Sequence, residues 1–223
     1  MPSGCRTGKP GRRCQTGGVT DPALTPDALP TRRGRPGYDS QQILAAAVDL
    51  FITHGYDATS VAAVAERLGL TKSALYHHYE SKEHLLRVAL DEALGGLEGV
   101  LDEPGARVPA AGARLEHVLR GAVRVLVERL PYVTLLLRVR GNSDVERQAL
   151  ERRRAFDHRI TGMVRDAQSE GTVRADVDPS VATRLVFGMV NSIVEWYRPT
   201  GAEGAAELAD DVLRVALDGL RTR

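Results

Sequence analysis

A cluster of hydrogen-bond donors in the first half of the chain has the composition of a nucleic-acid contact surface. Hydroxyl, ammonium and imidazole groups fill most positions from 71 to 78, and a further ammonium follows at 82: Thr71, Lys72, Ser73, Tyr76, His77, His78 and Lys82. Such groups donate hydrogen bonds to phosphate oxygens and to base edges. At position 82 the lysine charge and a helix N-terminus can serve the same phosphate. The alternative is structural, with Tyr76 in a core and the histidines on an ordinary surface.

The elements that must position these donors are short helices. Apolar residues at helical spacing run from Val61 to Leu68, the pattern breaks at Gly69, and Thr71 is placed to cap a second helix. Two helices joined by a tight turn with glycine are typical of a helix-turn-helix. Thr59 and Ser60 are expected to cap the first of them.

An earlier helix is expected to form the hydrophobic floor under this motif. It is capped by Asp39 or Ser40, and Gly55 ends it in the left-handed conformation. One face carries Ile43, Leu44, Ala47, Val48 and Phe51. We expect the ring of Tyr79 to insert into this floor rather than to contact DNA.

The string LTKSALYHHYESKEHLL, preceded by FITHGYDATSVAAVAERLG, resembles the DNA-binding domain of the TetR family of bacterial regulators from Tyr38 to about Leu86. The resemblance implies an all-α fold with a helix-turn-helix domain at 38–84 and a helical ligand-binding and dimerisation domain at 85–223. Tyr76, His77 and Lys82 would hold phosphates of double-stranded DNA, and Thr71, Lys72 and Ser73 would face base edges. His78, Thr59 and Ser60 complete the predicted DNA contacts.

Composition and charge agree with a nucleic-acid partner. Among the 223 residues, 1–37 carry seven Lys or Arg and two Asp or Glu, a balance of +5. Because the whole chain has a net charge of +1, the remainder is −4. We expect this Gly- and Arg-rich segment to be a disordered basic arm, which either reaches a minor groove or is a solvated tail without a role.

The sequence also predicts where the protein is located and whether it binds a metal. There is no apolar run long enough for a membrane span and no secretory signal, which predicts a cytoplasmic protein without a membrane partner. Cys5 and Cys14 lie in the arm without other ligands, so neither a metal site nor a disulfide is expected.

Apolar periodicity predicts helices for the rest of the chain. The helix that begins at Ser81 is expected to reach about Leu101, a loop to follow at 102–109, and helices to cover 115–127, 133–139, 145–167, 179–197 and 204–221. The family resemblance implies that the last two pack against their copies in a homodimer. Leu213 and Leu217 are the expected interface residues.

A wide apolar face interrupted by a few polar groups predicts a pocket for a small molecule in the C-terminal domain. The expected lining is Phe156, Met163, Phe187, Asn191 and Trp196, with Arg138 or Arg140 at its mouth for an acidic ligand. The string GMVNSIVEWYRPTG is similar to a TetR subgroup that answers to acyl-CoA thioesters. The ordinary alternative is that all five are core or interface residues.

The sequence thus predicts a ligand-responsive transcriptional repressor that leaves a palindromic operator when a small molecule, such as an acyl-CoA, binds. One alternative is an enzyme, but no GxSxG, HExxH, Gly-rich phosphate loop or Cys/His pair occurs, so neither catalytic residues nor a cofactor is expected. The other alternative is a DNA-bending architectural protein. That function needs wedge residues and a basic body, whereas this body is mildly acidic.

Overall fold

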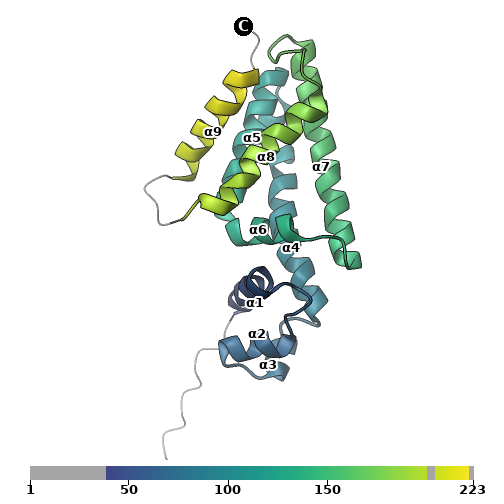
Figure 1. Cartoon of the computed structure of the whole chain (residues 1–223), viewed down its shortest axis with the longest axis vertical. Helices are drawn as coiled ribbons and strands as arrows, with labels where there is room; N and C mark the ends of the chain where they lie inside the picture. Colours follow the sequence, from purple (N-terminus) through teal and green to yellow (C-terminus); the bar gives the residue numbers. More distant parts are fainter. Residues whose placement is uncertain (1–38, 200–203, 221–223) are drawn as a thin grey trace, which may run out of the picture. The chain divides into compact units, whose positions relative to one another are not determined.

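A computed structural model describes residues 39–199 and 204–220, which lie in one compact unit, Tyr38–Arg223. The expected basic arm at 1–37 lies outside the described residues. Every regular element in those two ranges is helical (Figure 1). The elements are α1 (Ser40–His54), α2 (Val61–Leu68), α3 (Lys72–Tyr76), α4 (Lys82–Asp102), the short 3-10 helix η1 (Pro104–Arg107), α5 (Ala111–Glu128), α6 (Leu130–Arg138), α7 (Asp144–Ser169), α8 (Pro179–Trp196) and α9 (Ala205–Leu220). Among these helices none is long and apolar enough to cross a membrane.

Side-chain caps fix where the N-terminal helices begin. Asp39 accepts from the Gln42 amide and completes a capping box for α1. Ser60, Thr71 and Ser81 each accept from the amide three residues on, at the starts of α2, α3 and α4. These caps are therefore confirmed, and Asp39 rather than Ser40 caps α1. The expectation that Thr59 caps α2 together with Ser60 is wrong, because the Thr59 hydroxyl donates to Gly55 O.

Two glycines with positive φ shape the turns around α2. Gly69 has φ 64° and ψ 30°, the left-handed conformation that closes α2 before the tight turn into α3. Gly55 also has positive φ, 87°, but its ψ is 149°. The prediction that Gly55 adopts the left-handed helical conformation is therefore wrong, because the chain extends directly toward Tyr56 and Thr59 instead of curling back.

The three N-terminal helices share one of the two hydrophobic core clusters of the described unit with parts of the later helices. All five predicted floor residues of α1 are at most 4% exposed. They belong to the same cluster as Val133 and Leu136 of α6, Val190 of α8 and Val212 of α9. α1 packs on α6 as well as on α4 (Figure 1). Both α4 and α6 thus connect the N-terminal helices to the rest of the unit, and the domain boundary at 84 stays a prediction.

α4 and α5 cross at a pair of small residues. A Cβ atom added to Gly96 of α4 would lie 2.8 Å from Val125 Cγ1, and one added to Gly121 of α5 would clash with Val100 Cγ1. Each glycine thus receives the valine of the opposite helix, and the two backbones approach closely. This crossing lies near the middle of both helices.

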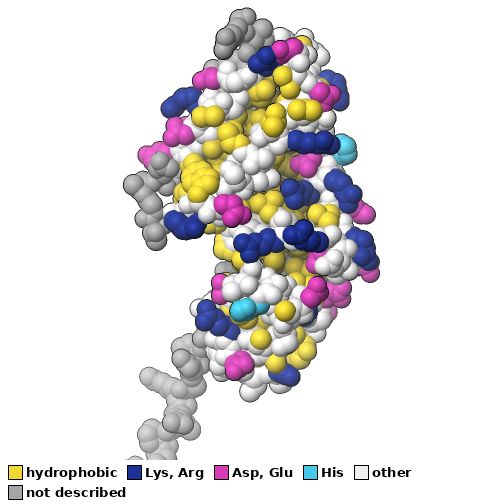
Figure 2. All heavy atoms as spheres, in the orientation of Figure 1, with side chains coloured by type: hydrophobic (Ala, Val, Ile, Leu, Met, Phe, Trp, Pro, Cys, Tyr) yellow, Lys and Arg dark blue, Asp and Glu magenta, His cyan; other side chains and the backbone are white. Residues whose placement is uncertain are grey.

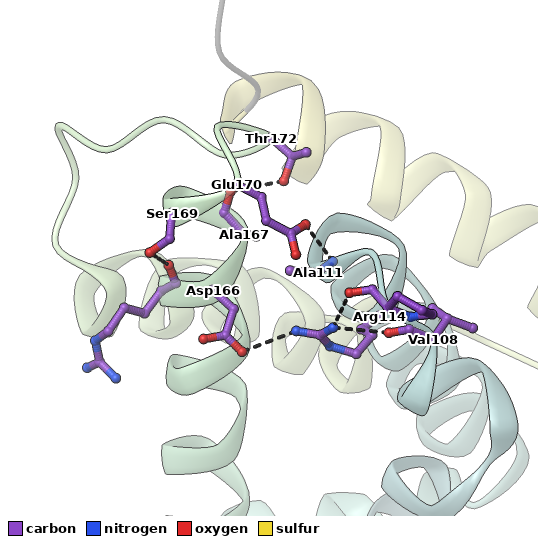
Figure 3. Close-up of polar contacts among 10 residues, drawn as sticks. Val108, Ala111, Arg114, Asp166, Ala167, Ser169, Glu170 and Thr172 are labelled. Atoms are coloured by element: carbon purple, nitrogen blue, oxygen red, sulfur yellow. Dashed lines mark hydrogen bonds and ion pairs between the residues drawn. The ribbon is translucent and has the colours of Figure 1, made fainter.

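The start of α5 is capped from another helix. Its N-cap, Ala110, has no side-chain acceptor, but Glu170, the C-cap residue of α7, accepts from the Ala111 amide at 2.7 Å (Figure 3). Beside it, Arg114 donates to Val108 O and Pro109 O and forms an ion pair with Asp166 at 3.2 Å. The carboxylate satisfies a free amide and lies at the positive end of the α5 dipole.

Replacing Glu170 with alanine should lower the free energy of unfolding by about 1 kcal/mol, the usual effect of losing an N-cap acceptor. Denaturant titration of the intact chain measures it. Ser169→Ala is the matched control, because the Ser169 hydroxyl donates only within α7, to Arg165 O. Equal midpoints for Glu170→Ala and the wild type would show that the contact does not stabilise the fold.

Candidate nucleic-acid interface and ligand cavity

The side chains of α3 form an exposed polar surface. Lys72, Ser73, Tyr76 and His77 are all exposed, and Tyr76, at 49%, is one of the few large hydrophobic residues that remain so. Leu75 faces inward and is fully buried, so it anchors the short helix. Thr71 and Ser60 are exposed caps whose hydroxyl oxygens already accept from Ala74 N and Ala63 N. These residues offer donors to solvent on one side of the helix-turn-helix.

Three of the residues predicted to contact DNA make contacts within the protein. Thr59 is 4% exposed, and its hydroxyl donates to Gly55 O at 2.8 Å. His78 Nδ1 lies 3.1 Å from Ser40 Oγ. The ammonium of Lys82 donates to Tyr56 O at 3.0 Å and lies 4.2 Å above the Tyr56 ring. Their observed contacts hold the turn before α2 and the end of α3 against their neighbours.

Tyr79 has the core role expected of it. Its side chain is 6% exposed, its hydroxyl donates to Ser40 O at 2.8 Å, and its ring packs edge-on against His84. Burial raises the pKa of Tyr79 above its ordinary value. The phenol therefore stays protonated and keeps its bond to α1.

In the C-terminal helices, α7 and α8 enclose an outer cavity of about 380 Å³. Most of the residues that line it have polar side chains, among them Arg153, Arg154, Asp157, Thr183, Arg184 and Asn191. Figure 2 shows basic side chains gathered along the boundary between these two helices. Burial raises the pKa of Asp157, and the charges of Arg153, His158 and Arg184 oppose that rise. The outer cavity therefore combines fixed positive charge with one half-buried carboxyl group.

An apolar inner chamber adjoins the outer cavity. It has a volume of about 30 Å³ and is lined by side chains from five helices, among them Leu97, Leu126, Val133, Leu136, Leu137 and Phe156. Arg153, Asp157, Phe187 and Asn191 line both spaces. The rings of Phe156 and Phe187 meet edge to face, 5.7 Å apart. The chamber has room for little more than a water molecule, so a larger ligand requires its walls to move.

Three of the five predicted ligand-binding residues line the outer cavity or the inner chamber, and two do not. Phe156, Phe187 and Asn191 line them, whereas Met163 and Trp196 line neither. Trp196 is 52% exposed at the end of α8. Arg138 and Arg140, expected at the pocket mouth, line a separate cavity beside the end of α1. The arginines at the mouth are instead Arg153, Arg154 and Arg184.

We did not predict from sequence that Arg153, Asp157 and Thr161 line the outer cavity, although their helical spacing could have indicated it. Arg153, Asp157 and Thr161 follow one another at intervals of four on α7, beside the apolar stripe that holds Phe156. Arg152 does behave as a structural residue, because it forms a bidentate ion pair with Glu98 of α4 at 2.7 Å and contacts Asp91.

Apolar side chains remain exposed on the last two helices. Val181, Leu185 and Trp196 of α8 and Val215 of α9 are 44–67% exposed, and Figure 2 shows hydrophobic side chains over α8. Leu213 and Leu217, the expected interface residues, are instead buried in the monomer at 4% and 8% exposure. A glutamate at either position would therefore unfold the core rather than split a dimer.

Among the residues that the structure describes, no group of three or more His, Cys, Asp or Glu side chains could hold a metal ion. The arm cysteines lie outside that part of the chain.

Comparisons with known proteins agree with this geometry. Residues 43–89 match the family model for bacterial regulatory proteins of the tetR family, and residues 109–220 match the tetracyclin repressor-like C-terminal domain. The chain is similar to SCO3833 of Streptomyces coelicolor A3, described as a member of the TetR transcriptional regulator family. The sequence identity is 56%, the TM-score is 0.75, and the alignment covers 81% of this chain and 91% of that one.

Two further relatives have names that state a function. The HTH-type transcriptional repressor KstR2 of Rhodococcus jostii is 26% identical over 88% of this chain and 98% of its own. AibR, solved in complex with isovaleryl coenzyme A and operator DNA, is 25% identical with a TM-score of 0.65, over 79% of this chain and 96% of its own. The chain therefore belongs to the TetR family of bacterial transcriptional regulators, which is a family of DNA-binding proteins rather than of enzymes.

Proposed function

We propose that the protein is a homodimeric repressor that binds a palindromic operator and leaves it when an acyl-CoA thioester binds. It would act in the cytoplasm, where it meets the chromosome. The names of KstR2, a repressor, and of AibR, crystallised with an acyl-CoA and operator DNA, support this proposal. A dimer would place two α3 helices in successive major grooves, about one DNA turn apart.

On the DNA side, α3 supplies the proposed contacts. Tyr76 and His77 would bind phosphates, while Lys72 and Ser73, with Thr71 at the cap, would face base edges. Ser60 would contact phosphate at the start of α2. Because Lys82, His78 and Thr59 bind neighbouring backbone or side chains, their main proposed role is to position α2 and α3. One ammonium hydrogen of Lys82 is left over for a phosphate.

The observation that carries the proposal is the double role of α6. Its residues Val133, Leu136 and Leu137 line the inner chamber. The next residue, Arg138, reaches α1 and donates to Ile52 O at 2.7 Å. One helix of nine residues thus contacts both the ligand space and the helix under the DNA-binding motif.

This arrangement gives ligand binding a mechanical consequence. The inner chamber is too small for an acyl group, so binding must displace its walls, and α6 is one of them. Displacing α6 moves the support of α1 and changes the separation of the two α3 helices. A ligand that prefers the displaced state lowers operator affinity by the ratio of its affinities for the two states.

Release from the operator tests both the proposed repressor function and the proposed coupling through α6. We expect the wild type to bind a palindrome from its own upstream region and an acyl-CoA to weaken that binding by about 5- to 150-fold, the usual range of allosteric coupling. Arg138→Gln should keep operator affinity but reduce this ratio. Fluorescence anisotropy of labelled DNA measures both.

Arg147→Gln is the matched control, because Arg147 bonds only within its own loop and helix, to Gly141 O and Asp144. It should behave as the wild type. If no acyl-CoA changes the operator affinity of the wild type, the proposed effector is wrong. If Arg138→Gln responds fully, the coupling does not run through this contact.

A further inference from the structure

Three arginines at the mouth of the outer cavity lack the ion pairs that many other arginines in the described ranges make, such as Arg114 and Arg129. Arg153 and Arg154 of α7 and Arg184 of α8 form no ion pair within 4 Å with any residue in the described ranges. Arg154 donates only to Leu150 O of its own helix. By contrast, the adjacent Arg152 is held by two acids of α4. We call Arg153, Arg154 and Arg184 the arginine cluster.

The arginine cluster is positively charged, whereas the domain that carries it has a negative net charge. Residues 38–223 have a net charge of −4, which is the +1 of the whole chain less the +5 of residues 1–37. At the outer cavity, three arginines face Asp157 alone among acidic residues. A local excess of positive charge on an acidic body attracts anions, and guanidinium groups are well suited to phosphate.

The inner chamber, which adjoins the outer cavity, is mostly apolar instead of charged. Beyond Phe187 and Asn191 the lining is apolar except for Arg153 and Asp157. A ligand that filled both parts would have an apolar tail, an uncharged middle and an anionic head. Asp157 lies where the middle would be and repels a carboxylate placed there, whereas a thioester is neutral.

We propose that the arginine cluster binds the phosphate groups of the effector's coenzyme A and that Asp157 excludes free carboxylic acids from the chamber. This inference rests on the proposed acyl-CoA effector and adds the residues that select it. The attraction at the mouth and the repulsion at the junction together distinguish the thioester from its hydrolysis product.

The test compares ligands that differ only in the head. Butyryl, isovaleryl, octanoyl and palmitoyl thioesters of coenzyme A and of pantetheine, with the free acids, are titrated calorimetrically into the full chain. Pantetheine thioesters have the same tail and linker but lack the phosphates together with the adenosine, so the arginine variants below are needed to assign the difference to the phosphates. For the wild type we expect coenzyme A thioesters to bind about tenfold or more tightly than pantetheine thioesters, by the usual strength of charged hydrogen bonds. This difference should shrink at high salt.

Substitutions in the arginine cluster and at Asp157 test which residues cause these differences in affinity. Arg153→Gln with Arg184→Gln should weaken binding of the coenzyme A thioester about tenfold and leave the pantetheine thioester unchanged. Arg159→Gln, an exposed arginine of α7 that lines neither space, should change neither. Asp157→Asn should strengthen binding of the free acid. Thermal melts without ligand verify that each variant folds.

The outcomes separate the two proposals. If both kinds of thioester bind the wild type equally, or the double arginine variant binds coenzyme A thioesters as the wild type does, the cluster is not the phosphate site and the acyl effector stands. If free acids bind Asp157→Asn no better than the wild type, Asp157 does not exclude free acids from the chamber. If no thioester binds the wild type, the acyl-CoA effector itself is wrong.

Discussion

Leu185→Arg should yield a monomer whose affinity for the full operator is lower by about 100-fold or more. Leu185 is 67% exposed, and together with Val181, Trp196 and Val215 it makes up the apolar surface that stays exposed on α8 and α9. A charge there would be buried without a partner in a two-fold interface. A monomer then binds each half-site separately and loses the gain from joining two contacts, which is commonly 10² to 10⁴.

Sedimentation velocity at micromolar concentration and operator anisotropy measure the two parts of this result. Ala155→Arg is the control, because Ala155 is exposed on α7 and is not a member of the apolar face on α8 and α9. Val215→Glu, on α9, should reproduce the effect from the other helix. A Leu185→Arg protein that remains a dimer with full operator affinity would show that this face is not the interface.

Glu146→Ala should lower the free energy of unfolding by about 3 kcal/mol or more. The carboxylate of Glu146 is 4% exposed and accepts from the backbone amides of Arg140, Gly141 and Asn142 at 3.1, 2.7 and 2.8 Å. Its removal leaves three amides of the α6–α7 loop without this acceptor, and a hydrogen bond to a charged group contributes about 1.5–3 kcal/mol.

For a chain of this size, that loss corresponds to a decrease in melting temperature of about 6–12 °C. Glu146→Gln keeps one acceptor oxygen and should lose less. Glu151→Ala, on an exposed position of the same helix, controls for the change in charge and should melt as the wild type. Equal melting temperatures for all four proteins would mean that solvent replaces the carboxylate at no cost.

The helices and their starts could be predicted from sequence because the signals are local. An apolar stripe repeats within one helix, as in α1, and a cap such as Thr71 or Ser81 acts on an amide three residues away. The core role of Tyr79 was expected because the apolar face of α1 offers its ring a place to pack. The family resemblance rested on the same stretch of the chain.

The ligand site could be predicted only in part, because its walls come from helices far apart in sequence. Periodicity shows that α8 is apolar on several sides but not which side meets α7, so it could not show that Phe187 and Asn191 line the cavity while Trp196 is exposed. Arg152 and Arg153 are neighbours with the same side chain. Only the fold shows that α4 holds the first and the cavity exposes the second.

The glycine crossing of α4 with α5 has a geometric consequence for the α3 surface. Because Gly96 and Gly121 each receive a valine of the opposite helix, α4 cannot slide along α5 without collision, and rotation about the crossing is the freer motion. From Gly96 to Lys82 is a lever of about 21 Å, at 1.5 Å per residue. A rotation of about 5° would therefore carry the N-terminus of α4 through about 2 Å. In a two-fold assembly both levers turn, so the separation of the two α3 helices would change by up to about 4 Å, against a groove spacing of about 34 Å.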